Sequence, residues 1–407
     1  MNLQWTPMRW PASWKDPATL RLLKDAPINC LLVASGSDLG PVADQAKRLG
    51  LAVAEHTPMG VALSTGEWPG IQMAAHGGGF SAGPTGVPWL NSNGWRVRLQ
   101  AALHPDTGIW IDAPPPKDTR PFPDSFAMAF TDSAVFGGRW IVSLDDATAA
   151  ALAAQDARAL AGWNRLMAAA RFFDARKAWA DDAAEAVVGV VSDFSGDHEF
   201  LSSETLNLVS RANQQYRIIV KDRITDASWK GLRAILYVDP EPPLPGLRRE
   251  IEALVAGGKM LIAGPRWGRV NGLLAKDQEH PRYDIRVVGK GRVALAKAEP
   301  DDPYTLANDS VLLVSHRYEL LRFFNCGAVS SYLTAAPDHK TTLLHLLFYA
   351  NRGPDDASVH VAGRYQSARL WTIDRPEPRP LEVQAGREGV ELHLPAMSQY
   401  AVAELEA

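Results

Sequence analysis

The first 183 residues alternate between short apolar runs and amphipathic stretches. Residues 28–34 form a compact apolar run typical of a buried strand, residues 39–49 carry apolar side chains at helical spacing, and residues 51–55 again favour a strand. This strand–helix–strand order predicts parallel pairing. The alternation continues with strands at 70–75, 108–112 and 139–144 and helices at 94–103 and 123–136.

This alternation is typical of a (β/α) barrel. A closed eight-stranded barrel takes ~250 residues, and the segment 1–183 is shorter than that. We therefore expect a reduced or incomplete TIM-like (β/α) barrel.

The stretch 184–300 favours a second α/β unit. Its helices are expected near 202–214 and where Leu247, Ile251 and Val255 share one face. Its apolar runs predict strands at 186–192, 217–221, 234–239 and 259–263. This order indicates an open, doubly wound sheet of the flavodoxin type.

From residue 301 onward the period of the pattern changes. Turn residues separate short apolar runs at regular spacing, which predicts a small C-terminal β-sandwich over 301–407. The expected strands are 343–349, 358–362, 368–372, 381–384, 390–394 and 400–404.

Composition narrows the choice of partners. The 407-residue chain has a net charge of −4, which gives no electrostatic reason to expect nucleic acid or an anionic membrane. No apolar run reaches the ~18 residues that span a bilayer, and the first residues lack the features of a signal peptide. Cys30 and Cys326 are too far apart in the sequence to suggest a metal or disulfide motif. We expect a cytoplasmic protein without a cofactor.

Four short stretches carry a resemblance to a known family. They are VGVVSDF at 188–194, GGKMLI at 257–262, GKGRV at 289–293 and LHLLFY at 344–349. In this order they resemble the family 42 β-galactosidases, in which a catalytic barrel precedes a trimerisation domain and a small β domain. The resemblance covers roughly the last half of the chain. It implies a carbohydrate as partner and a homo-oligomer, plausibly a trimer. The stretch 83–95 resembles segments of uncharacterised glycoside-hydrolase-like proteins.

The family's catalytic residues do not all transfer to this sequence. Its acid is a glutamate directly after an asparagine at the end of the fourth strand, and this sequence contains no Asn-Glu pair. Asp112 follows Ile111 at the end of the expected fourth strand. The nucleophile of the family belongs to a seventh strand, which a reduced barrel need not contain.

Three other carboxylates are candidates for catalysis. Glycoside hydrolysis needs two carboxylates across the scissile bond, and barrel enzymes place them at carboxyl ends of strands. Asp112 and Asp145 follow neighbouring strands, and Glu67 precedes Trp68 in a loop. Each also has a plain structural explanation: Asp145 or Asp146 suits a helix N-cap, and Asp112 and Glu67 suit solvated surface positions.

Aromatic and amide side chains in the first segment could hold a sugar. Trp68 and Trp89 lie in Gly/Pro-rich loops, and Asn91 and Asn93 follow Trp89 closely. An indole can stack on the apolar face of a sugar, and amides can bind hydroxyl groups. The alternative is core packing, which is the favoured role for Trp95 on an apolar helix face.

The loop after the strand at 186–192 contains Asp193, Asp197, His198 and Glu199. These are possible metal ligands, but such loops are often acidic without a metal, so no metal site is expected. The sequence as a whole predicts a glycoside-hydrolase-like protein that binds or cleaves a carbohydrate at the barrel rim. The alternative is a non-catalytic carbohydrate-binding or structural relative.

Overall fold

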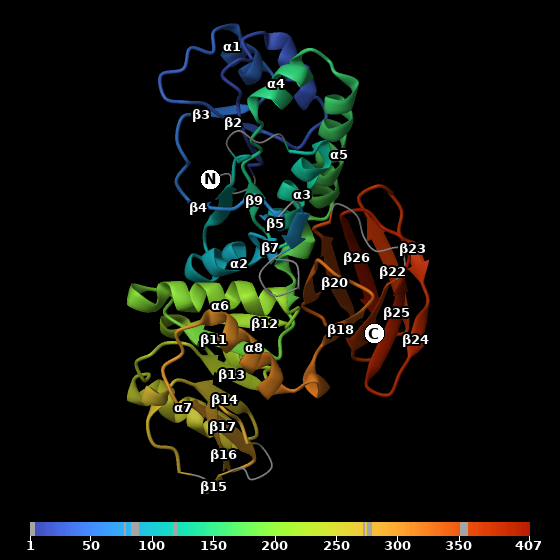
Figure 1. Ribbon diagram of the computed structural model, residues 1–407. Coiled ribbons are helices and arrows are strands. Elements are labelled where there is room, and N and C mark those ends of the chain that lie inside the picture. The colour runs from blue at the N-terminus through green and yellow to red at the C-terminus, as the bar shows by residue number, and fades with distance from the viewer. Residues whose placement is uncertain are drawn as a thin grey trace.

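The computed structural model describes residues 5–76, 79–82, 89–116, 121–271, 273–274, 279–350 and 357–407. For residues 72–76, 79–82, 89 and 274 it describes the backbone alone. An N-terminal α/β region lies at one end of the molecule, a second α/β region lies at the other, and a C-terminal β region lies beside them (Figure 1). None of the described helices is long and apolar enough to cross a membrane.

The described part of the N-terminal region contains six short parallel strands in two groups of three. The first sheet has the order β1 (Pro7–Arg9), β2 (Cys30–Leu32), β3 (Ala52–Ala54). The second has the order β4 (Val61–Thr65), β8 (Gly108–Asp112), β9 (Arg139–Trp140). A parallel bridge between Met8 and Val142 joins the two groups. The strands therefore follow one another as in a barrel, and within the range 5–76 no pairing joins β3 to β4.

The two groups of strands together form an arc. Side chains at alternate strand positions point to its inner and its outer face. Cys30, Trp110 and Ile141 form a small buried cluster against which Ala52 of β3 and Val61 of β4 pack. Since the two end strands both reach this cluster, the arc curls around it. The intervening positions, such as Leu31 and Ile109, belong instead to a larger core shared with the surrounding helices. Those helices are α1 (Pro41–Arg48), α3 (Pro123–Ala134), α4 (Asp146–Ala153) and α5 (Ala157–Ala175).

The strand expected at 70–75 is present but does not belong to the parallel arc. It is β5 (Gly70–His76), which pairs antiparallel with β6 (Gly79–Ala82) and β7 (Trp89–Asn91). The reason is the length of the connections. Two residues separate β5 from β6 and six separate β6 from β7, whereas a parallel pair needs a crossover of a dozen residues or more.

The middle region has the flavodoxin-type order that the sequence predicts. Its parallel strands are arranged β12-β11-β13-β14-β17, and β16 and β15 continue the sheet in antiparallel fashion. Their bounds are β11 (Val188–Ser192), β12 (Tyr216–Val220), β13 (Ala234–Tyr237), β14 (Met260–Ala263), β15 (Leu273–Leu274), β16 (Tyr283–Val288) and β17 (Gly291–Ala296).

Helices cover both faces of this sheet. On one face, α6 (Glu199–Arg211) and α8 (Pro303–Val314) share a core with Trp95 and Leu99 of α2 (Gly94–Leu103). On the other face lies α7 (Pro245–Ala256), through Ile251 and Val255. Gly291 allows the β16–β17 turn to approach α7 closely, because a Cβ there would lie 2.1 Å from the Val255 carbonyl oxygen. The segment limits 1–183, 184–300 and 301–407 stay a prediction.

The C-terminal region consists of two facing antiparallel sheets. The larger has the order β10-β19-β20-β26-β22-β23 and the smaller β18-β21-β25-β24. All six predicted strands are present: β20 (Thr341–Phe348), β21 (Ala357–Ala362), β22 (Ser367–Thr372), β23 with β24 (Arg379–Leu381, Val383–Ala385), β25 (Gly389–Leu394) and β26 (Tyr400–Glu406). The others are β10 (Ala183–Ala184), β18 (Leu321–Phe324) and β19 (Val329–Ala335).

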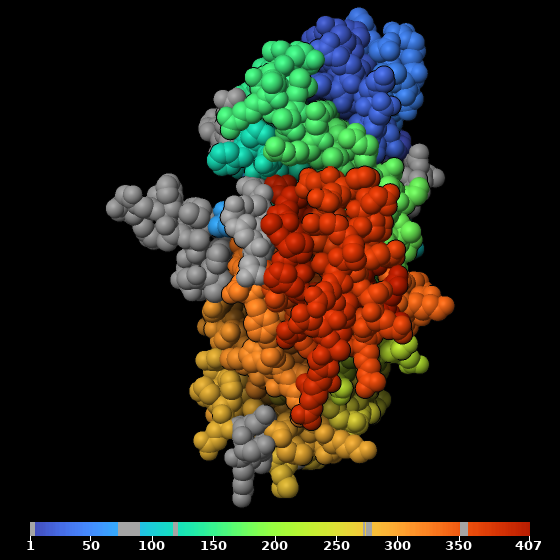
Figure 2. Space-filling model, turned by 90° about the vertical axis from the view of Figure 1, so that its right-hand side faces the viewer, coloured from blue at the N-terminus to red at the C-terminus, as the bar shows by residue number. Residues whose placement is uncertain are grey.

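Strands β20 and β26 are buried on both faces. Their side chains at positions such as Leu344 and Ala403 fill the core between the two sheets. Those at positions such as Leu343 and Val402 pack on Phe172 of α5. Two-sided burial explains why consecutive positions of β20, such as Leu343 and Leu344, are both apolar. Figure 2 shows the C-terminal region lying across the junction of the other two.

A buried polar network fastens this β region to α3. The carboxyl of Asp132 is fully buried; it accepts hydrogen bonds from the Tyr349 hydroxyl at 2.5 Å and from the Asn93 backbone and side-chain amides at 2.8 and 3.0 Å. Burial raises the pKa of Asp132 to about 6. The raised pKa means that ionising this carboxyl opposes folding.

The pH dependence of stability should report this burial. The folded protein holds the Asp132 proton up to about pH 6, against 3.8 for an ordinary carboxyl, so the associated stability is full below the lower value and lost as pH rises through the upper one. We expect Asp132→Asn, which stays neutral, to gain up to ~3 kcal/mol over the wild type above pH 6. Urea unfolding between pH 4 and 8 measures this difference, with exposed Asp106→Asn as control. Parallel pH curves for the wild type and Asp132→Asn would contradict it.

Candidate functional site

A groove of about 740 Å³ lies where the carboxyl end of β4 meets the middle region. Three elements line it: the end of β4 with the residues after it, one face of α2, and the start of α6 with the short 3-10 helix before it (Gly196–His198). The lining side chains combine carboxylates, a guanidinium, an amide and aromatic rings: Thr65, Glu67, Trp95, Arg96, Gln100, Asp197, Glu199, Phe200 and Glu204. Of the predicted catalytic residues, Glu67 lines this groove.

Glu67 is held through its backbone by a buried asparagine. The side chain of Asn93 accepts a hydrogen bond from the Glu67 amide and donates one to the Glu67 carbonyl, each at 2.8 Å. At the preceding residue, Gly66, a Cβ would lie only 2.4 Å from Ile111, so glycine is needed for this close approach. With its backbone fixed, the half-exposed carboxylate of Glu67 reaches Arg96 at 3.3 Å.

Glu204 brings a second carboxyl to the groove from α6. It accepts a hydrogen bond from Asn207 at 3.0 Å. Burial raises the pKa of Glu204, and the charge of Glu67 raises it further, while Arg211 and Arg96 act in the opposite direction. Of these two carboxyl groups, Glu67 is thus ion-paired and Glu204 has a raised pKa, a difference that acid–base catalysis uses.

Aromatic groups complete the groove. The Arg96 guanidinium stacks on the Trp95 ring at 4.4 Å, and Trp95 itself is buried in the core as its helix position predicts. Phe200 is 72% exposed. An exposed aromatic ring beside charged hydrogen-bonding groups can bind a ligand with both apolar and polar faces.

The other two predicted carboxylates have partners elsewhere. Asp112 forms an ion pair with Arg9 at 2.7 Å, and its strand position pairs with Thr65, which lines the groove. Asp145 is the N-cap of α4, where its side chain accepts a hydrogen bond from the Thr148 amide at 2.9 Å. This is the helix-capping role that the sequence offered as an alternative.

The predicted sugar-binding residues are dispersed. Trp68 packs edge-on against Phe126 and Trp140, with its ring centre 5.4 and 5.7 Å from theirs. These contacts are those of a core side chain. Asn91 pairs with β5, and Asn93 orients Glu67 from a buried position. The side chain of Trp89 lies outside the described residues.

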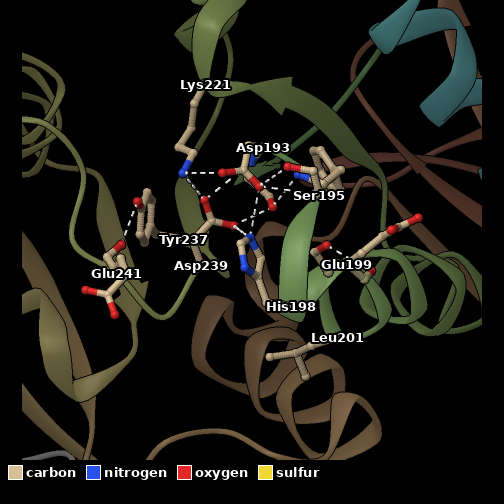
Figure 3. A network of polar contacts seen from close by, with 12 residues as sticks. Asp193, Ser195, His198, Glu199, Leu201, Lys221, Tyr237, Asp239 and Glu241 are labelled. Atoms are coloured by element: carbon tan, nitrogen blue, oxygen red, sulfur yellow. Dashed lines mark hydrogen bonds and ion pairs between the residues drawn. The ribbon is translucent and has the colours of Figure 1, made fainter.

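A charged cluster lies at the carboxyl edge of the middle sheet (Figure 3). The His198 Nε2 lies 3.0 Å from Asp193 and 2.9 Å from Asp239. Lys221 bonds to Asp193 at 2.9 Å and also to Asp239. The sequence indicated Asp193 and His198 only. Lys221 and Asp239 follow β12 and β13, which flank β11, and the carboxyl ends of these neighbouring strands could have pointed to them.

The side chains of this cluster are of the types that bind a divalent metal, but the Lys221 ammonium already bonds to both of its carboxylates. Donor atoms of Asp193, His198 and Asp239 lie within 4.8 Å of one another. The Lys221 ammonium bonds to both carboxylates, and Ser192 also donates to Asp239. The Lys221 ammonium therefore offsets part of the negative charge, and the cluster fixes the segment with Asp197 that leads into α6 and its Phe200.

Replacing Lys221 should lower the stability of the protein. Asp239 is almost fully buried, and Lys221→Met would leave its charge without the main cation. We expect the free energy of unfolding to fall by about 3 kcal/mol, measured by urea denaturation at pH 7. Lys230→Met, an exposed lysine of the same region, is the control. A loss no larger than that of the control would contradict the role assigned to Lys221.

The comparisons with known proteins place the fold. No model of a known protein family matches the sequence, and no curated protein matches it significantly. Among solved structures, α-L-fucosidase isoenzyme 2 from Paenibacillus thiaminolyticus is 12% identical with a TM-score of 0.51, over 74% of this chain and 60% of that one. A rhamnosidase from Novosphingobium sp. PP1Y is 14% identical with a TM-score of 0.51, over 90% of this chain and 38% of that one.

Structures of β-galactosidases are also similar. A GH42 β-galactosidase from G. stearothermophilus, solved as a catalytic mutant, is 9% identical with a TM-score of 0.43, over 90% of this chain and 67% of that one. Across most of its length the chain thus shares its fold, at low sequence identity, with the fucosidase and the rhamnosidase. It spans only 60% of the fucosidase. The likeness concerns the fold.

Proposed function

We propose that this glycoside-hydrolase-like protein binds a carbohydrate in the groove between β4, α2 and α6. The observation that carries the proposal is the grouping of exposed Phe200 with Glu67 and Arg96 along one concave surface. The ring offers a stacking face for the C–H side of a sugar, and the charged groups offer hydrogen bonds to its hydroxyls. The position at a carboxyl strand end is where barrel enzymes bind their ligands.

We further propose that Glu67 and Glu204 act as the carboxylate pair if the bound sugar is cleaved. Glu204, whose pKa burial raises, would protonate the leaving oxygen, and ion-paired Glu67 would attack or activate water. The alternative is a non-catalytic sugar-binding or structural relative. It is supported by the engagement of Asp112 with Arg9 and of Asp145 in a helix cap.

Two glutamine variants test both parts of this proposal. On a panel of aryl glycosides, we expect Glu67→Gln and Glu204→Gln to lower turnover by at least ~100-fold. The wild-type rate should fall as pH rises through the pKa of Glu204, because the acid loses its proton. Exposed Glu388→Gln, in the C-terminal region, should leave the rate unchanged. Turnover insensitive to both groove variants would refute the carboxylate pair.

Binding is measured separately from turnover on a glycan array followed by calorimetry. Phe200→Ala should weaken binding of a selected glycan by roughly 3- to 10-fold, whether or not the glycan is cleaved. Glycan binding without turnover would select the non-catalytic alternative. Binding that Phe200→Ala leaves intact would place the sugar elsewhere.

We also propose that the chain forms a homo-oligomer, as the resemblance of the middle region to a trimerisation domain implies. Light scattering coupled to size exclusion should give about three times the chain mass of 44.3 kDa. A mass near 44.3 kDa would contradict this assembly.

A further inference from the structure

A second hollow, of about 330 Å³, lies at the opposite edge of the middle sheet from the charged cluster. It is bounded by the amino ends of β13, β14 and β17 and by the residues that follow α8. Among the described residues that line it, none is acidic and five are basic: Arg233, Lys259, Lys290, Arg292 and Arg317. In a chain with more acidic than basic residues, 46 against 42, this local excess of positive charge is not a reflection of composition.

Three of these cations have no carboxylate partner among the described residues. Among the described residues, none of Arg233, Lys290 and Arg317 forms an ion pair with a carboxylate, and Lys259 donates to the Leu232 carbonyl at 2.6 Å instead. Arg233 and Arg317 both lie against the Tyr318 ring, at 5.2 and 5.9 Å. Burial, and then the charge of Arg233, lower the pKa of Lys259. Like charges are therefore held close together at a cost that a bound anion would relieve.

We propose that this basic hollow binds a small ligand carrying phosphate or sulfate groups. Arginine guanidinium groups present paired N–H donors that match a tetrahedral oxyanion, and lysine ammonium groups add point charges. Ser315, at the end of α8, adds a hydroxyl to the lining. The volume is that of roughly ten water molecules at ~30 Å³ each, which suits a diphosphate or a sugar ester better than a single ion. This site is separate from the groove and does not depend on the function proposed for it.

The competing explanation is that the basic residues only stabilise helix ends. Helices α7 and α8 both end beside the hollow, just before Gly257 and Ser315, and the carboxyl end of a helix attracts cations. Each end contributes about half a negative charge. Two ends therefore offset about one positive charge, which is fewer than the three cations Arg233, Lys290 and Arg317 that have no carboxylate partner among the described residues.

Calorimetric titration with pyrophosphate at constant ionic strength tests the proposal. Lys290 and Arg317 are exposed, so the double variant Lys290→Gln/Arg317→Gln should fold normally. We expect the wild type to bind pyrophosphate and the double variant to bind it at least about tenfold more weakly, equivalent to ~1.4 kcal/mol. Arg249→Gln, an exposed arginine on α7, should bind like the wild type.

Parallel titrations distinguish the ligand's source. Orthophosphate, inorganic sulfate and a sulfated disaccharide at matched ionic strength show whether phosphate or sulfate chemistry is preferred. Affinity for the preferred anion should fall in the double variant, as for pyrophosphate. No binding by the wild type of any of these anions at millimolar concentration would overturn the proposal. So would binding that the double variant retains, and a lowered melting temperature of that variant with unchanged binding would assign the residues to helix ends.

Discussion

The contact between the N-terminal region and the C-terminal β region depends on the fully buried carboxyl of Asp132. This carboxyl sits on α3, receives the hydroxyl of Tyr349 from the end of the β20 strand, and receives two N–H groups from Asn93. The Asn93 side chain in turn forms two hydrogen bonds with the backbone of Glu67. One side chain thus fixes the contact of the β region and, at one remove, the carboxylate of the groove. Because an unpaired carboxyl in this position would be costly, Tyr349 and Asn93 must both be placed beside it.

Local pattern was enough to predict most elements. Apolar runs with turn signals gave the strands of the middle sheet and of the C-terminal sandwich, because each strand there is bounded by turn residues and packs along its own length. The pattern did not reveal how β5 pairs. Its composition suits a parallel or an antiparallel strand equally, and only the short connections to β6 and β7 decide. The opening of the arc between β3 and β4 is likewise a matter of pairing that periodicity does not encode.

The groove was predictable in part for the same reason. Glu67 was a candidate because it lies in a loop before an expected strand, and the structure places it just after β4, a strand that the pattern did not predict. Its partners Arg96 and Glu204 come from α2 and α6, far along the chain, and neither carries a local motif. Lys221 and Asp239 were missed in a similar way, since only the order of β12, β11 and β13 brings them to Asp193. A site formed by residues of different helices and strands depends on the topology of the fold. Local sequence patterns do not give that topology directly.

The two-sided burial of β20 and β26 has a consequence for the architecture as a whole. A module that can be exchanged between proteins needs a water-compatible surface where it meets its neighbours. Here the face of the larger sheet that turns toward α5 carries Leu343, Leu347 and Val402 against Phe172, and cutting the chain ahead of this sheet would expose that face and the helix together. The C-terminal sandwich is therefore an integral part of the fold and not a separable domain. A substitution on this face of the sheet therefore requires a compensating substitution on α5.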